Sequence, residues 1–194
     1  MSGNRELILA GIKGGGSGGT GLGWFGPIGT VAPTTANLAL NSAFLDVGLV
    51  DKEGLTRSVS ESSNDIEAFG QQGPVRTITT SSKVTFKIKF LESNPVALAV
   101  YHRLPLGAIV PDVNGAFDFT EGEARTETYA GVFDNIDGDN YVRAYCPTLE
   151  VTGREEFAIK GGAGIMYGVE LTAYPGDDGV AVHWFYLVPE LAGA

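Results

Sequence analysis

Residues 83–93 read KVTFKIKFLES, and apolar and polar side chains alternate without a break from Lys83 to Phe90. Successive side chains of a strand point to opposite faces of a sheet, so this period of two predicts a half-buried β-strand. Phe86 and Ile88 are the expected core anchors of this strand. The buried side carries Val84, Phe86, Ile88 and Phe90, and the solvated side carries Thr85, Lys87 and Lys89.

Hairpin signals fill the second half of the chain. Asn114-Gly115, Asp137-Gly138 and Asp178-Gly179 separate segments rich in β-branched and aromatic residues, and such dipeptides accept the positive φ angles of tight turns. The chain, with 28 Gly and 9 Pro, is therefore predicted to be mainly β, an antiparallel β-sandwich or barrel. The expected strands lie within residues 44–50, 74–81, 83–93, 116–122, 124–136, 140–153, 155–162, 164–176 and 179–189.

One flanking α-helix is predicted within residues 92–103, ESNPVALAVYHR. Ser93 or Asn94 would cap its first turn, and Pro95 would occupy the first helical position, where no N–H is required. The helix is too apolar to stand in solvent, so we expect it to lie against the sheet.

Two connecting segments are less regular. A short helix, capped by Thr34 or Thr35, is possible within residues 34–44. Residues 55–74 are polar with few apolar anchors, and they predict either a long loop or an extended hairpin arm. Segments of this length inside a compact domain usually serve a function or an interface.

The glycine-rich stretch at residues 11–26 contains GSGGTG (16–21), which has the spacing of a dinucleotide-binding loop. Such a loop must open a helix whose N-terminus binds phosphate. Here strand and turn residues follow, and no carboxylate appears before Asp46. We interpret residues 1–23 as an N-terminal arm used in assembly, ahead of a single domain at residues 24–194.

The charge balance disfavours nucleic-acid binding. The chain has 13 Lys and Arg against 23 Asp and Glu, a net charge of −10, whereas phosphate binding requires clustered basic residues. The single Cys146 excludes an internal disulfide and reads as a buried, inert thiol. Neither a leader nor a membrane-spanning segment is evident, so a soluble protein is expected.

Candidate chemical sites are weak. Asp134, Asp137 and Asp139 invite a calcium interpretation, but their spacing is not that of a calcium loop and a hairpin turn explains them. Neighbouring Glu155 and Glu156 would point to opposite faces of a strand. The Lys87 and Lys89 pair is typical of a solvated strand face, and His102 and His183 read as partly buried structural residues. We therefore predict no catalytic, metal-binding or cofactor-binding residues.

Residues 46–102 resemble the major tail tube proteins of long-tailed, non-contractile bacteriophages, especially those that infect actinobacteria. Phe69 stands where the family has Trp, a departure that keeps an aromatic anchor. The shared features are Gly48, Gly54, Ile66, Phe69, Val75-Arg76-Thr77, Ser81-Ser82 and Glu92-Ser93-Asn94.

The resemblance implies a structural virion protein without catalysis or cofactor. It implies a β-sandwich with a flanking helix, hexameric rings, and stacked rings forming a tube that conducts DNA into the host without binding it specifically. Expected partners are further copies of the chain and the tape-measure, tail-tip and terminator proteins, with assembly in the host cytoplasm and no membrane. We also expect an electronegative inner wall, to which Glu170 contributes.

One alternative belongs to a different functional class. A virion decoration protein or a tail-tip module that binds a receptor or carbohydrate would expose an aromatic platform. Trp24, Trp184 and Tyr186 are the candidates for that platform.

Overall fold

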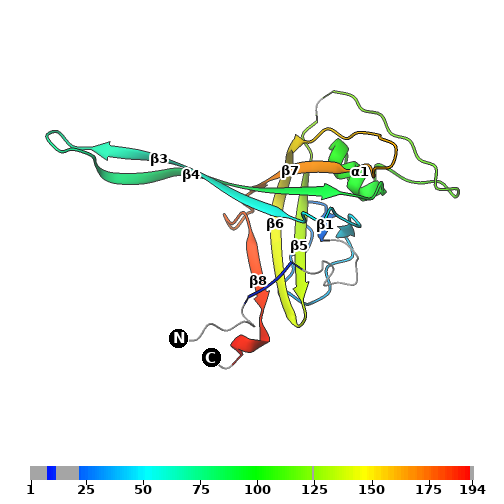
Figure 1. Ribbon diagram of the computed structural model, residues 1–194, viewed down its shortest axis with the longest axis horizontal. Coiled ribbons are helices and arrows are strands. Elements are labelled where there is room, and N and C mark those ends of the chain that lie inside the picture. The colour runs from blue at the N-terminus through cyan, green and yellow to red at the C-terminus, as the bar shows by residue number, and fades with distance from the viewer. Residues whose placement is uncertain (1–7, 12–21, 124, 193–194) are drawn as a thin grey trace.

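The computed structural model describes residues 8–11, 22–123 and 125–192. These residues form one antiparallel sheet of eight strands, in the order β2-β1-β5-β6-β7-β4-β3, with β8 paired to β6 (Figure 1). The predicted mainly β class with one flanking helix is confirmed. The elements are β1 (Gly23–Gly26), β2 (Leu45–Asp46), β3 (Thr56–Glu67), β4 (Pro74–Phe90), α1 (Pro95–His102), β5 (Thr128–Asp137), β6 (Asn140–Arg154), β7 (Tyr167–Tyr174), β8 (His183–Leu187) and a short 3-10 helix (Pro189–Leu191).

The sheet bends sharply at the middle of β6. The first part of this strand pairs with β8 from Tyr141 to Tyr145, and the second part pairs with β7 from Thr148 onward. Pro147 lies between the two, where its missing N–H removes a ladder bond. The halves of the sheet consequently run at a steep angle to each other, as Figure 1 shows for β5 and β7.

A bulge in β6 makes the same corner. The register between β5 and β6 shifts after Tyr129, where Pro147 and Thr148 of β6 stand opposite Ala130 alone, and a bulge bends and twists its strand. Gly131 allows the two strands to approach there, because a Cβ at this position would collide with the Leu149 side chain.

The main core lies between the two halves of the sheet. Phe86 of β4 packs against Phe133 of β5 with ring centroids 5.1 Å apart, and Phe25 of β1 contacts Phe90 edge-on. Phe86 and Ile88 are 0% and 1% exposed. The predicted face assignment for this strand is therefore confirmed.

Helix α1 covers the open side of this core. The Asn94 side chain accepts a hydrogen bond from the Ala97 N–H, which identifies the cap, and Pro95 opens the helix as predicted. The helix ends at Arg103, whose φ of 56° is left-handed. Five consecutive residues, Ala97 to Tyr101, are buried, because the helix also lies under the connection that leads to β5.

The short helix expected within residues 34–44 is not formed. The physical reason lies more than 100 residues away in the chain, at Arg143 of β6. Its guanidinium donates hydrogen bonds to the carbonyl oxygens of Thr35 and Leu38, at 3.0 and 2.8 Å. Those carbonyls are the acceptors that a helix in this segment would use.

Three expected strands are also wrong or shortened. The segment at 44–50 keeps only the two residues of β2, and residues 116–122 and 155–162 contain no strand. Residues 116–122 belong to the long connection after α1, where Glu121 is held by His102 and Arg154. Residues 155–162 follow β6: the Glu155 N–H still donates to the Gly168 carbonyl of β7 at 2.9 Å, and the segment then leaves the sheet and enters a turn at Gly161 and Gly162.

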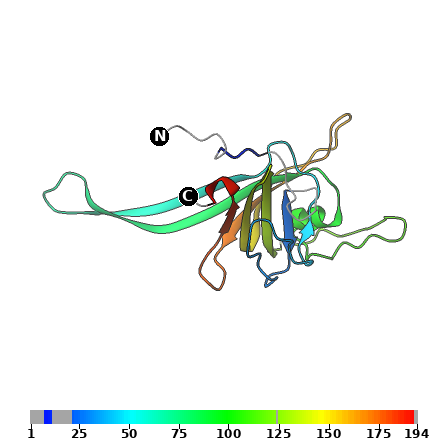
Figure 2. The same cartoon turned by 90° about the horizontal axis from the view of Figure 1, so that it is seen from below.

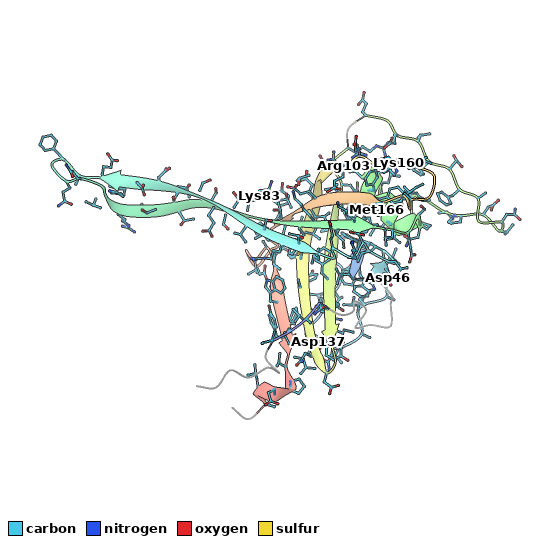
Figure 3. The ribbon with its side chains drawn as sticks, viewed as in Figure 1. Asp46, Lys83, Arg103, Asp137, Lys160 and Met166 are labelled. Carbon is cyan, nitrogen blue, oxygen red and sulfur yellow. The ribbon has the colours of Figure 1, made fainter. Side chains whose placement is uncertain are left out.

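The segment at 55–74 is an extended hairpin arm, not a loop. Strand β4 pairs with β7 only from Val84 to Phe90, so its earlier residues pair with β3 alone and project from the body (Figures 1 and 2). We use "the arm" for residues 60–83 of this projecting ribbon. Figure 3 shows Lys83 at the root of the arm.

Candidate assembly surfaces

The arm is a two-stranded ribbon without cover from the rest of the subunit. Every residue of β3, and of β4 from Pro74 to Lys83, is exposed. Among the described residues neither long edge of the arm pairs with a further strand. Unpaired edges are templates for another chain, and an isolated hairpin is only marginally stable in water. These features make the arm a candidate surface for binding another chain.

Charges on the arm are separated by face. Directly opposed residues of antiparallel strands share a face, and along β3 the residues Glu61, Asp65 and Glu67 all point to one side. Their opposites are Ser82, Thr77 and Pro74. The register between Asp65 and Thr77 is supported by a hydrogen bond of 2.6 Å from the Thr77 hydroxyl to the Asp65 carboxylate. We call this side the acidic face.

The opposite side of the arm carries the cations. Lys83 is paired with Ser60 and Arg76 with Ile66, and these β3 residues alternate with the acidic ones. We call this side the basic face. Among the described residues, Glu61, Glu67, Arg76 and Lys83 form no ion pair.

Outside the arm, the polar face of β4 and β7 bears a set of ion pairs. Lys87 lies 3.2 Å from Glu170, its cross-strand neighbour, and Lys89 lies 3.1 Å from Glu155. The Glu155 hydrogen bond raises the pKa of Lys89. Glu170 points away from the core beside buried Leu171, as expected, so this face carries carboxylates that are partly neutralised by lysines.

The acidic turn at 134–140 is not a cluster of free carboxylates. Asp134 is buried and accepts two hydrogen bonds of 2.7 Å from the Arg143 guanidinium. Burial raises the pKa of Asp134, and the hydrogen bonds to Arg143 act against that rise. At the tip of the hairpin (Figure 3), the Asp137 carboxylate accepts a hydrogen bond from the Ala10 N–H. Within the described ranges no three His, Cys, Asp or Glu residues are grouped to hold a metal.

The histidines and the cysteine have structural surroundings. His102 Nδ1 lies 2.6 Å from the Glu121 carboxylate, which fastens the connection after α1, and His183 lies 3.0 Å from Asp178. Cys146 is fully buried and burial raises the pKa of its thiol, as an inert core cysteine requires.

The three aromatic candidates do not form one platform. Trp24 is 4% exposed and packs with Phe44, Val132 and Tyr145 on the other side of the sheet, so its assignment to a platform was wrong. Trp184 and Tyr186 are 40% and 61% exposed and stack with centroids 6.2 Å apart. Arg57, at the base of β3, lies over the Trp184 ring at 5.7 Å.

The glycine-rich GSGGTG stretch lies outside the described residues. Next to it, the backbone of Ala10 is held against the β5–β6 turn by Asp137 and by Asn135, whose side-chain N–H donates to the Ala10 carbonyl at 3.0 Å. This contact places the short segment 8–11 beside the body of the subunit. In the described part of the chain no helix is long and apolar enough to cross a bilayer.

The described part of the chain is an antiparallel β-domain with a long arm whose two strand edges are open to pairing with another chain. A family model described as phage tail tube protein matches residues 17–190. The chain belongs to the phage tail tube protein family, which confirms the resemblance seen in residues 46–102. It is accordingly a structural tail protein and a virion component.

The other comparisons add little. No curated protein matches the chain. Among solved structures, a chain from the virion of a native gene transfer agent particle aligns at a TM-score of 0.43 with 8% identity, covering 76% of this chain and 92% of the other.

Proposed function

We propose that this protein forms hexameric rings that stack into the hollow tube of a phage tail, and that the genome passes through the tube into the host. Membership of the tail tube family supports the tube itself. The observation that carries the assembly step is the arm, an exposed ribbon with two free edges that one subunit leaves unpaired.

The charge of the chain suits a DNA conduit. A net charge of −10 disfavours trapping of a polyanion, because like charges repel DNA from the wall and let it slide. We propose that the inner wall is predominantly electronegative, with the polar face of β4 and β7 around Glu170 as the candidate lining. A density map of the tube that shows a continuous basic lining would refute this assignment.

The same proposal assigns roles to the parts of the chain. Residues 24–194 form the ring-building domain, and residues 1–23 act as an assembly arm on neighbouring copies. The tube is built in the host cytoplasm around a tape-measure protein and is bounded by tail-tip and terminator proteins. No catalysis, cofactor or metal has a part in it.

Electron microscopy of the purified protein tests the central claim. Stacked rings with a central hole are expected, and their rotational symmetry gives the ring size directly. A population of single, unstacked particles under all salt and concentration conditions would contradict a tube. That result would favour the decoration or tail-tip alternative, for which the exposed pair Trp184 and Tyr186 would be the first surface to test against carbohydrates.

A further inference from the structure

The two charged faces of the arm fit each other. We propose that arms of neighbouring copies stack face to face in the assembled protein, with the acidic face of one arm on the basic face of the next. This inference rests on the proposed self-assembly and adds the contact surface, its direction and the residues that pair across it.

The charges on the two faces lie at matching heights along the arm. Lys83 is level with Ser60, one residue from Glu61, and Arg76 is level with Ile66, between Asp65 and Glu67. One residue along a strand is about 3.3 Å. When two identical arms are superimposed and then moved apart without sliding, Lys83 of one therefore faces Glu61 of the next, and Arg76 faces Asp65 and Glu67.

An arm cannot neutralise these charges by itself. Cross-strand pairs of opposite charge are the usual way in which a hairpin stabilises an exposed face. Here the carboxylates of Glu61 and Asp65 stand opposite Ser82 and Thr77, and Lys83 stands opposite Ser60. Each face is left with charge of one sign, and only a second molecule supplies the other sign.

The side chains between the charges permit a close approach. The acidic face carries the small hydroxyl residues Ser63, Thr77, Thr79 and Ser82, and the basic face carries Ser60, Ser62 and Ser81 beside Asn64, Ile66 and Ile78. Stacked sheets pack about 10 Å apart, a gap that a lysine and a glutamate reaching toward each other span together. The small residues on the arm include Ser60, Ser62, Ser63, Ser81 and Ser82.

The contact has a direction, because each arm contacts one neighbour through its acidic face and the other neighbour through its basic face. Such a head-to-tail interface repeats around a rotation axis and closes into a ring when the rotation divides the circle. An edge-to-edge arrangement of the arms would satisfy backbone hydrogen bonds, but it would set acidic faces beside acidic faces. The charge pattern therefore favours stacking by faces.

Charge exchange tests the pairing at the root of the arm. Lys83→Glu and Glu61→Lys each place like charges across the contact, and we expect each to raise the protein concentration needed for assembly roughly tenfold, since an exposed attraction becomes a repulsion of similar size. The double variant K83E/E61K and an equal mixture of the two single variants both restore opposite charges. Both are expected to assemble as the wild type does.

Controls separate this effect from net charge and from folding. Lys52→Glu makes the same change of charge on an exposed turn of the body and is expected to assemble normally. Arg76→Glu repeats the test at the outer level of the arm. All of these positions are exposed, so the melting temperature of the unassembled subunit should not change, and high salt should reduce the difference between variants by screening.

The outcomes are distinguishable. If the wild type assembles and the single variants assemble as K52E does, or if neither the mixture nor the double variant is rescued, face-to-face stacking is wrong and edge pairing remains. If the wild type forms no rings or tubes under any condition, the proposed function fails and this inference fails with it.

Discussion

Truncating Phe86 to alanine measures how tightly the corner of the sheet is packed. The ring is fully buried, lies 5.1 Å from the Phe133 ring, and sits on a strand held on both sides, opposite Arg57 of β3 and Leu171 of β7. The flanking strands cannot close the cavity, so the loss should fall in the upper part of the range for Phe→Ala, about 4–5 kcal/mol.

This loss of free energy is large enough to read directly. In a domain of this size about 1 kcal/mol moves the melting temperature by about 2–4 °C, so a drop of about 8–20 °C is expected. Urea unfolding of the subunit, held below the concentration at which it assembles, gives the free energy itself. Phe69→Ala is the matched control, because the same atoms are removed from a fully exposed ring at the tip of the hairpin, and it should stay within about 0.5 kcal/mol of the wild type. The reasoning is refuted if Phe86→Ala melts with the wild type, or if Phe69→Ala costs as much.

Three further results are expected. Arg143→Met leaves the Asp134 carboxyl buried without its partner and should cost about 3–5 kcal/mol in urea unfolding, whereas D134L/R143M should recover a large part of that loss; equal losses in both variants would contradict a buried-charge penalty. The His102 hydrogen bond lowers the pKa of Glu121 below 4.5, so this carboxylate stabilises the fold above that pH and the contribution disappears as pH falls through the lowered pKa; E121Q should match the wild type in strong acid and be less stable near neutrality, and a constant difference at all pH values would argue against the linkage. Amides of the arm, residues 60–83, should exchange with solvent much faster than those of β4 from Val84 onward in the free subunit and become protected in tubes; equal exchange in both states would show that the arm finds no partner.

Local pattern was sufficient for the strands that one face buries and for the helix. The period of two around Phe86 and Ile88, the glycine turn at Gly138, where φ is 60°, and the Asn94-Pro95 start of α1 all act within a few residues. Interactions between residues a few positions apart can be predicted from the sequence alone, which is why these elements were predicted.

Contacts between residues far apart in the sequence could not be predicted from local pattern. Trp24 looked like an exposed aromatic because β1 is covered on both faces, and a sequence does not show what covers a strand. Residues 34–44 have a helical pattern, and no residue near them in the sequence indicates that Arg143 donates hydrogen bonds to two of their carbonyl oxygens. Residues 155–162 have a strand-like pattern, but Phe157 packs against Tyr101 of α1 and Tyr167 of β7, which are contacts that the local sequence does not show.

Two features of the assembly surfaces, the Asp134–Arg143 pair and the separation of charge on the arm, could have been predicted from the sequence. Asp134 and Arg143 flank the two turn residues Gly138 and Asp139 at equal distance, so a hairpin there places them opposite each other. The arm had a similar signal, because the segment ESSNDIE has its carboxylates at odd positions from 61 to 67. Once that segment is taken as a strand instead of a loop, the separation of charge by face follows.

Strand β4 is one unbroken strand of 17 residues whose outer part lies in the arm and whose inner part lies in the core. A pull on the arm is therefore transmitted straight into the body of the subunit. Between Val84 and Phe90 the hydrogen bonds to β7 lie across the direction of that pull, so they are loaded together in shear and not opened one after another. If a neighbouring copy binds the arm, tension along the assembly is borne in each subunit by a strand that is anchored in the core through Phe86, Ile88 and Phe90, and the arm acts as a mechanical tie.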